Sequence, residues 1–428
     1  MKLLSIFSLF FLTSLHGQVQ LIKHENSDSN TTLLIIAGIH GNEPGGYFAA
    51  SILATNYAIV SNNVWIVPNL NQASILRNRR GIHGDMNRKF SVIKKNDKDM
   101  KIIKEIKNII LAPQVSLVLN LHDGHGFYRK KYQGSIFNPT AWGQTCVIDQ
   151  CNLKEEQEFG NLTNIASTVK NNVNTKLLEK HHSFNVKNTK TKYEDEAMQL
   201  SLTYFAVTNN KPAFAVETSK NLKTLSQKVF YQLLAIEEFM KIMHITYKRN
   251  FTMNEKSITK IIKNYGKLNI NNTINLNLGN IKKHLRFIPI KYSNNVFHFS
   301  HPLGAYRKVK DNYQVYIGNK KITTLRSDYF KIKPDCIKSF DAIVDGKLIS
   351  IKKTSSFDVK ADFKILKTQG IRVNVIGFHS KKSKDESNIL IKAKDLNKVY
   401  SVDKKHKIYR VEFYEKDRFC SMSMVNFK

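Results

Sequence analysis

Four continuous apolar runs, separated by amphipathic stretches, constrain the fold of this 428-residue chain more than any other feature of its sequence. Each run has the length of a strand and little polar alternation, as is typical of strands that are buried on both faces of a sheet. The runs are LLIIAGI (33–39), VWIVPNL (64–70), VSLVLNL (115–121) and AFAVET (213–218). Helical periodicity occupies the stretches 44–55, 97–111, 155–178 and 222–243. This alternation predicts an α/β domain in which a mixed sheet is flanked by helices.

After Tyr247 the pattern changes to shorter alternating segments, broken by Asn, Gly and Lys clusters. These segments predict strands and include HLRFIPIKY (284–292), YQVYIG (313–318), IRVNVIGFH (371–379) and NILIKAK (388–394). Because the chain exceeds what one hydrophobic core usually covers, we expect several domains. We place the α/β domain at 18–247, a β-rich domain at 248–340 and a β-sandwich, immunoglobulin-like, at 341–428.

The first 17 residues have the pattern of a secretory signal peptide. Lys2 precedes an apolar run from Leu3 to Leu12, which is too short for a transmembrane helix, and no later stretch is apolar enough to span a bilayer. A buried first strand or helix is the alternative, but it would not need a basic start. We therefore expect residues 1–17 to direct export, and several small residues offer competing cleavage points.

The chain is strongly basic, with 67 Lys and Arg against 34 Asp and Glu and a net charge of +33. Such a surface attracts anionic lipid, wall polymer or nucleic acid, and charge alone does not choose among them. The export signal and the absence of helix-turn-helix, zinc-finger and ribonucleoprotein motifs disfavour nucleic acid. A general bias toward Lys and Asn explains the charge equally well.

The four cysteines lack the CxxC spacing of a structural zinc site; they are Cys146, Cys151, Cys336 and Cys420. Cys146 and Cys151 could pair across a short loop in an oxidising compartment. Isolated buried thiols are an equally good expectation.

Three residues of metal-ligating types follow the buried runs. In GIHGNEPGG (38–46), His40 and Glu43 come directly after the first run, and His122 directly continues the third. Since ligands bind at the carboxyl ends of strands in open α/β sheets, we expect these side chains to meet. Two imidazoles and a carboxylate form a catalytic zinc set that leaves a fourth position for water. H-x-x-E alone would more often be an ordinary turn, and we interpret His125 as pocket lining.

Glu217 ends the fourth run, in KPAFAVETSKN (211–221), and would bring a second acid to the same edge of the sheet. Beside a metal-bound water, a carboxylate can take the water proton as general base and return it to a leaving amine as general acid. A glutamate that caps a loop or pairs with Lys220 is the alternative.

A basic segment, LRNRRGIHGDMNRKF (76–90), contains Arg80, Asp85, Asn87 and Arg88. Guanidinium groups hold carboxylates through paired donors, which suits recognition of a C-terminal carboxylate. Arg80 could also polarise a scissile carbonyl and stabilise its oxyanion. We expect Asp85 to orient a ligand or fix Arg88; a solvated basic loop is the alternative.

In their order along the chain, the H-x-x-E pair, the basic segment, His122 and Glu217 resemble the zinc carboxypeptidase superfamily, which includes the aspartoacylase and succinylglutamate desuccinylase branch. More narrowly, LLIIAGIHGNEPGG, GDMNRKF, LVLNLHDGHGFYRK and NPTAWG resemble the cell-shape-determining periplasmic D,L-carboxypeptidases of curved and helical Gram-negative bacteria. This likeness extends to the length, the signal peptide and the two β-rich domains. It implies a murein tripeptide carboxypeptidase that trims the peptidoglycan stem tripeptide to a dipeptide, between γ-D-glutamate and meso-diaminopimelate.

The resemblance also implies roles for individual residues. One zinc per chain would be held by His40, Glu43 and His122. Glu217 would act as the base, Arg80 would act in catalysis and substrate binding, and Asn87 and Arg88 would bind the carboxylate. Some members of the narrower group have glutamine at the first ligand position, so His40 favours firm zinc binding. Trp142 and Thr203 could shape the pocket around the second carboxylate of diaminopimelate, or simply pack in the core.

Other functions remain open at this stage. A metal-dependent deacylase of small N-acyl amino acids would share the zinc and arginine framework, and a wall-binding pseudoenzyme would keep the scaffold without activity. Export and the appended domains favour the peptidase. The β-rich domains contain no recognisable catalytic cluster, so we expect them to bind the wall or cell-shape protein partners.

Overall fold

The computed structural model describes residues 19–26, 29–381 and 383–428, so the expected signal peptide at 1–17 lies outside the described residues. The chain divides into two compact units, one that ends at Ile262 and one that spans Lys263–Lys428. The domain boundaries expected from the sequence stay predictions. Within the described ranges, no helix combines the length and apolar character needed to cross a membrane.

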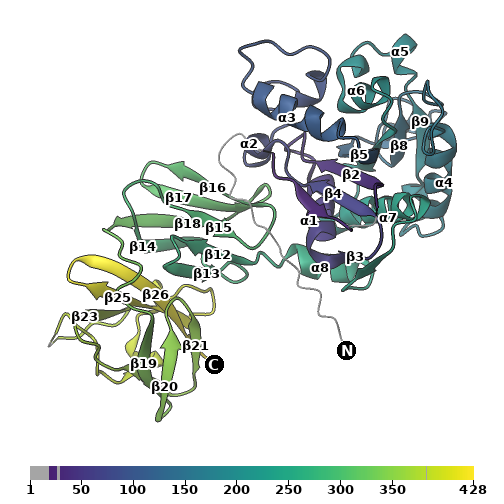
Figure 1. Cartoon of the computed structure of the whole chain (residues 1–428). Coiled ribbons are helices and arrows are strands. Elements are labelled where there is room, and N and C mark those ends of the chain that lie inside the picture. The colour runs from purple at the N-terminus through teal and green to yellow at the C-terminus, as the bar shows by residue number, and fades with distance from the viewer. Residues whose placement is uncertain (1–18, 27–28, 382) are drawn as a thin grey trace. The chain divides into compact units, whose positions relative to one another are not determined.

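A seven-stranded mixed sheet forms the centre of the first unit, in the order β1-β4-β2-β5-β10-β8-β9 (Figure 1). The four predicted apolar runs form its parallel middle: β2 (Thr32–Ala37), β4 (Asn63–Val67), β5 (Val115–Gly124) and β10 (Ala213–Ser219). At the edges lie β1 (Ile22–His24), antiparallel to β4, β8 (Thr145–Ile148), antiparallel to β10, and β9 (Asn185–Asn188), parallel to β8. This sheet confirms the predicted α/β class.

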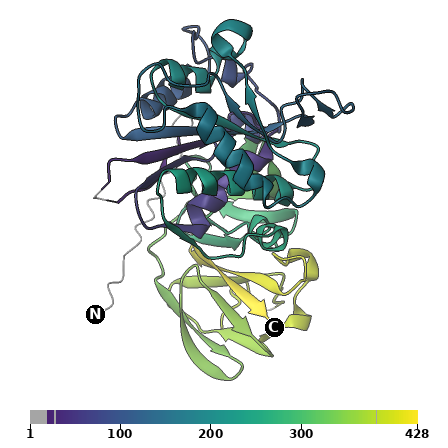
Figure 2. The same ribbon diagram turned by 90° about the vertical axis from the view of Figure 1, so that its right-hand side faces the viewer.

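Helices cover both faces of the sheet, as can be followed in Figures 1 and 2. On one face pack α1 (Pro44–Asn56), α4 (Leu162–Asn174) and α7 (Leu225–Ile242), and on the other pack α3 (Met100–Ile110) and α6 (Leu202–Thr208). The apolar stripe of α3 explains its orientation, because Ile103, Ile106 and Ile110 are all buried. Three of the predicted helices are therefore confirmed in position.

The predicted helix at 155–178 is too long at both ends. The helix α4 begins only at Leu162, because the Asn161 side chain accepts a hydrogen bond from the Asn164 amide and caps the first turn. Residues 155–161 form a turn and irregular backbone instead, and the helix ends at Asn174.

The start of α1 lies unusually close to the sheet. A Cβ atom at Gly46 would lie 2.9 Å from the Leu121 carbonyl oxygen, so only glycine allows this approach. Pro44 opens the helix, where its missing N–H costs nothing. This contact brings Glu43, just before α1, next to the carboxyl end of β5.

The first unit is completed by β3 (Tyr57–Ile59), α2 (Gln72–Ile75), β6 (Phe127–Tyr128), β7 (Phe137–Asn138), α5 (Thr191–Glu194), β11 (Tyr247–Arg249) and α8 (Glu255–Ile262), with 3-10 turns at Met86–Arg88, Lys180–His182 and Met198–Leu200. β11 pairs with β3 and α8 packs on α7, which joins both to this unit.

The second unit is built almost entirely of strands. Its first part holds two sheets, which contain β12 (Lys267–Ile270), β13 (Ile274–Asn277), β14 (His284–Ile290), β15 (Phe297–Phe299), β16 (Gly304–Val309), β17 (Asn312–Ile317) and β18 (Lys320–Tyr329). Its last part holds two four-stranded sheets, β20-β19-β22-β24 and β21-β26-β25-β23. The predicted β-rich character is therefore confirmed, and immunoglobulin-like topology stays a prediction.

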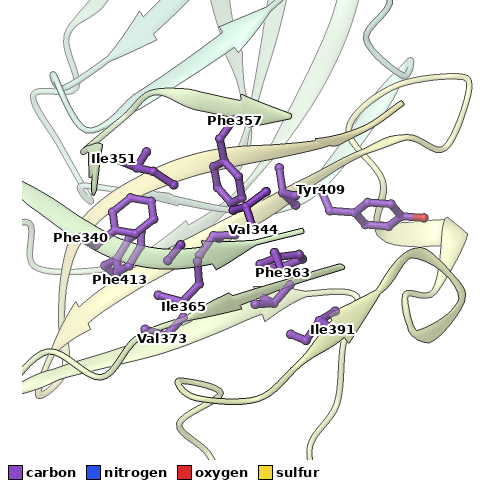
Figure 3. Packing of buried hydrophobic residues seen from close by; sticks show 14 of the residues in the cluster. Phe340, Val344, Ile351, Phe357, Phe363, Ile365, Val373, Ile391, Tyr409 and Phe413 are labelled. Atoms are coloured by element: carbon purple, nitrogen blue, oxygen red, sulfur yellow. The ribbon is translucent and has the colours of Figure 1, made fainter. Parts of the chain in front are cut away.

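The last two sheets enclose one apolar core (Figure 3). Their strands are β19 (Ser339–Val344), β20 (Lys347–Lys352), β21 (Ser356–Val359), β22 (Asp362–Ile365), β23 (Ile371–Ile376), β24 (Ile391–Lys392), β25 (Ile408–Glu415) and β26 (Arg418–Phe427), with 3-10 turns at Ala393–Asp395 and Lys398–Tyr400. The rings of Phe340 and Phe413 pack with centroids 4.5 Å apart. The strand expected at 388–394 is nearly absent, because the Asp395 side chain accepts from the Lys392 amide and starts a turn.

Cys336 and Cys420 form a disulfide in the second unit, whereas Cys146 and Cys151 are free thiols. The short-loop pairing of Cys146 with Cys151 is therefore wrong. The alternative of an isolated buried thiol describes Cys146 in β8, whereas Cys151 is exposed.

Candidate metal centre

Three side chains meet at the carboxyl edge of the central sheet. His40 follows β2, Glu43 precedes α1 and His122 lies in β5, and all three are at least 96 % buried. Glu43 Oε2 lies 3.1 Å from His40 Nδ1 and 2.8 Å from His122 Nδ1. Each residue offers one ligand atom, and these atoms all lie within 4.8 Å of one another. Two imidazoles and a carboxylate around one point fit a zinc-type metal ion.

Asp85 fixes the ring of His40. Its Oδ1 lies 2.8 Å from His40 Nε2, and its Oδ2 accepts from Arg80 Nε at 2.9 Å. Although burial raises the pKa of Asp85, hydrogen bonds from His40 and Arg80 hold it well below its usual range. The ring therefore presents Nδ1 toward Glu43, and this nitrogen has no hydrogen bond within the described part of the chain. A carboxylate behind a ligating imidazole is a common support of metal sites.

Glu43 is an anion among cationic groups. Burial raises its pKa, but His40 and His122 lower it well below the usual value. Arg80 Nη1 and Lys220 Nζ each lie 3.3 Å from its Oε1. The carboxylate is therefore ionised, as a metal ligand must be.

Glu217 faces this cluster from the neighbouring strand. In the parallel pairing of β10 with β5, Glu217 is the register partner of His122. Burial raises its pKa to about 7, against the lowering effect of His122. A carboxyl group with such a pKa can exchange protons near neutral pH.

The predicted site residues line one cavity of about 250 Å³. Among its described lining residues are His40, Glu43, Arg80, Asn87, Arg88, His122, Trp142, Thr203 and Glu217. His125 lines it as well. Asn87 is anchored because its Oδ1 accepts from the Leu202 backbone N–H at 3.0 Å, and its own backbone N–H donates to Asp85 Oδ1.

Asn120 and Lys220 are polar cavity residues to which the sequence analysis gave no place in the site. Asn120 is 99 % buried, and neither atom of its side-chain amide has a hydrogen bond among the described residues. It precedes His122 by two positions on β5, so strand alternation could have placed both on one face. Lys220 follows β10, and its long side chain reaches Glu43. No local sequence pattern predicts this contact.

A second group of potential ligands is formed by Glu179, His181 and His182. Its atoms already have partners: Lys223 Nζ lies 3.1 Å from Glu179, and His182 Nδ1 lies 3.0 Å from the Tyr231 hydroxyl. The His40 cluster is therefore the better candidate for a metal.

Comparison with known families agrees with this geometry. A family model described as the catalytic part of the carboxypeptidase that controls helical cell shape matches residues 2–263. A second model, the C-terminal domain of metallo-carboxypeptidase, matches residues 333–428. Fold and site together are those of a metallocarboxypeptidase, a hydrolase that uses a bound metal. The chain belongs to the family of carboxypeptidases that control helical cell shape, which confirms the resemblance found in the sequence.

Solved structures of the cell shape determinant protein Csd4 from Helicobacter pylori match the whole architecture. Its apo form has 35% sequence identity and a TM-score of 0.90, and the match covers 96% of this chain and 100% of that chain. A tripeptide-bound form and an mDAP-bound form, the latter described as a D,L-carboxypeptidase, match with the same values. No match was found among curated proteins.

Proposed function

We propose that this chain is a zinc-dependent D,L-carboxypeptidase that trims the peptidoglycan stem tripeptide to a dipeptide. The scissile bond joins γ-D-glutamate to meso-diaminopimelate. The observation that carries this proposal is the single cavity in which Glu217 faces the His40, Glu43 and His122 cluster beside two arginines. The tripeptide and mDAP complexes of the Helicobacter pylori relative support the choice of substrate.

One zinc ion per chain would be held by His40 Nδ1, Glu43 and His122 Nδ1. The two imidazoles favour zinc over magnesium or calcium, which prefer oxygen ligands. Bound there, zinc would lower the pKa of water to about 7 and polarise the scissile carbonyl. Asp85 keeps His40 in the ligating orientation.

Glu217 moves the proton in this reaction. Its carboxylate takes a proton from the attacking water and delivers it to the amino nitrogen of diaminopimelate as the amide bond breaks. The hydroxyl of the water stays on the γ-carboxyl of glutamate, so the atoms balance. Burial in the cavity raises the pKa of Glu217, which favours its uptake of the water proton.

The arginines fix the substrate. Arg88 and Asn87 would hold the terminal carboxylate, because a guanidinium offers paired donors to it. Arg80, which lies 3.3 Å from Glu43, would stabilise the oxyanion beside the metal. These groups would restrict the enzyme to a C-terminal residue.

Asn120 would recognise the far end of diaminopimelate. That end carries both an ammonium and a carboxylate, and an amide can accept from the first while it donates to the second. Both amide atoms of Asn120 lack hydrogen bonds in the described structure, and they line the cavity with Trp142 and Thr203. A buried amide left unpaired penalises any substrate that lacks matching groups.

The protein would act in the periplasm, exported by its first 17 residues. Its strongly basic β-rich unit would bind the anionic wall or cell-shape protein partners.

Product identification tests this function. The purified mature chain is incubated with muramyl tripeptide, and the products are identified by mass spectrometry. We expect free meso-diaminopimelate and muramyl dipeptide. N-acetylaspartate and N-succinylglutamate serve as matched substrates for the deacylase alternative, and their preferred hydrolysis would contradict the proposal.

A further inference from the structure

The second unit contains a cavity of about 980 Å³ that has no part in the proposed reaction. Strands β23 and β25 form one of its walls. Alternate side chains leave a strand on opposite faces, so Val373 and Phe413 enter the apolar core of Figure 3, while Arg372, Asn374 and Glu412 line the cavity. Its volume lies within the roughly 300–1,000 Å³ of small-molecule sites.

Glu412 is a buried acid with incomplete hydrogen bonding. It is 98 % buried, and its Oε2 accepts from the Tyr414 hydroxyl at 2.7 Å. Its Oε1 forms an ion pair with Arg410 Nη1 at 3.4 Å but has no hydrogen bond within the described structure, and Arg410 Nη1 donates instead to the Phe287 carbonyl. Burial raises the pKa of Glu412. A donor in the cavity would therefore satisfy an acceptor whose isolation is costly.

Arg372 is a fixed donor beside this acid. Its guanidinium carbon lies 4.4 Å from the ring centroid of Tyr414, and Nη1 donates to Asn374 Oδ1 at 2.5 Å. Asn374 is the register partner of Glu412, so the arginine and the acid lie on adjacent strands of one wall. An arginine has five N–H donors, and the remaining ones can bind a carboxylate.

Among the described residues, the charges that line the cavity are balanced, unlike those of the unit around it. Residues 263–428 contain 35 Lys and Arg against 14 Asp and Glu. The described lining contains three of each kind: Arg372, Lys381 and Lys384 against Asp328, Glu386 and Glu412. A site for a polyanion would be one-sidedly basic. The balance favours a ligand that carries both signs.

We propose that this cavity binds the zwitterionic α-amino acid group of a free amino acid or of a peptide end. Its ammonium would donate to Glu412 Oε1 and its carboxylate would accept from Arg372. The rings of Phe330 and Tyr414, with centroids 5.3 Å apart, would pack against the aliphatic chain. The cavity itself does not depend on catalysis, but the choice of diaminopimelate as probe rests on the proposed function.

Calorimetric titration of the mature full-length chain with meso-diaminopimelate tests this site. An Arg88→Ala background removes the carboxylate clamp of the metal centre, and one binding site per chain should remain. Glu412→Gln or Arg372→Gln in that background should weaken it by about tenfold or more. Pimelate, which lacks the amines, and cadaverine, which lacks the carboxylates, should bind far more weakly. Binding of muramyl tripeptide at the same site would identify a peptide end as the ligand, and its failure would identify the free amino acid.

Matched controls separate this site from the metal centre. Glu412→Gln in the otherwise unchanged chain should leave kcat/KM on muramyl tripeptide unaltered. The melting temperature shows whether each variant folds, and the partly exposed Arg372 is the milder change. No binding in the Arg88→Ala background, binding that both variants leave unchanged, or equal binding of pimelate would each overturn the proposal. Absence of hydrolysis with Glu412-dependent binding intact would reject the proposed function alone.

Discussion

Glu217 and His122 are register partners on the parallel strands β10 and β5, so both side chains leave the sheet at the same level. Sheet pairing therefore fixes the acid beside the imidazole without any contribution from a loop. Gln232 on α7 reinforces the pair, because its Nε2 donates to the His122 carbonyl at 2.7 Å and to the Val216 carbonyl at 3.2 Å.

Glu217→Gln should separate metal binding from turnover. The amide keeps the shape of the side chain but cannot accept the water proton, so kcat should fall by about 10²- to 10⁴-fold. Metal analysis should still find one zinc per chain, because Glu217 is not among the three proposed ligands. Near-normal turnover in this variant would remove Glu217 from the role of base.

Asn120→Leu should reduce discrimination rather than general activity. The leucine fills the space but offers neither donor nor acceptor to the far end of diaminopimelate. We expect kcat/KM on muramyl tripeptide to fall by about 10- to 100-fold. A tripeptide with lysine in place of diaminopimelate, which lacks the second carboxylate, should lose much less. Equal losses on both substrates would show that Asn120 only packs.

Gln232→Leu should lower both stability and turnover. The change removes the Nε2 donor from the carbonyls of His122 and Val216, and two lost hydrogen bonds cost about 1–3 kcal/mol in free energy of unfolding. Ala235→Gly on the same helix is the matched control, because it costs about 1 kcal/mol in helix propensity and removes no side-chain hydrogen bond to either strand. If both variants had equal kcat, Gln232 would have no positioning role.

The second unit should lose stability on acidification through His301. Burial lowers the pKa of this histidine to about 4, and its Nδ1 accepts from the Leu303 amide at 3.1 Å, which requires the neutral ring. Since the folded pKa lies below the unfolded value of about 6.5, the unfolded state takes up the proton first. The contribution of His301 to the free energy of unfolding is therefore fully present above pH 6.5 and is lost as the pH falls toward 4.

Chemical denaturation at pH 7.5 and at pH 5 measures this effect. We expect His301 to account for a loss of about 2 kcal/mol between these values. In His301→Asn, the side-chain oxygen can still accept from the Leu303 amide but does not titrate. The variant should therefore depend less on pH, and an unchanged dependence would assign the effect to other groups.

The sequence could place part of the site, because His122 and Glu217 lie near the ends of strands. Continuous apolar runs identified the four parallel strands, and the carboxyl ends of such strands meet at one edge. His122 and Glu217 were therefore placed together from strand patterns alone. Asn120 was missed although it lies on the same strand, because an unpaired amide becomes visible only when its surroundings are known.

Features that depend on distant partners could not be predicted. Lys220 contacts Glu43 across 177 residues, and the Cys336–Cys420 disulfide closes 84 residues. The predicted helix at 155–178 was too long for a local reason. The polar residues before Asn161 suit either a turn or a helix, and the Asn161 side chain caps the first turn, so the helix begins only at Leu162.

Anomalous diffraction at the zinc absorption edge, from crystals of the metal-loaded chain, tests the central claim most directly. We predict one zinc peak within about 2.0–2.2 Å of His40 Nδ1, a Glu43 oxygen and His122 Nδ1, with Glu217 facing it. A zinc peak at another group of residues, or none at this cluster in a catalytically active crystal, would contradict the account.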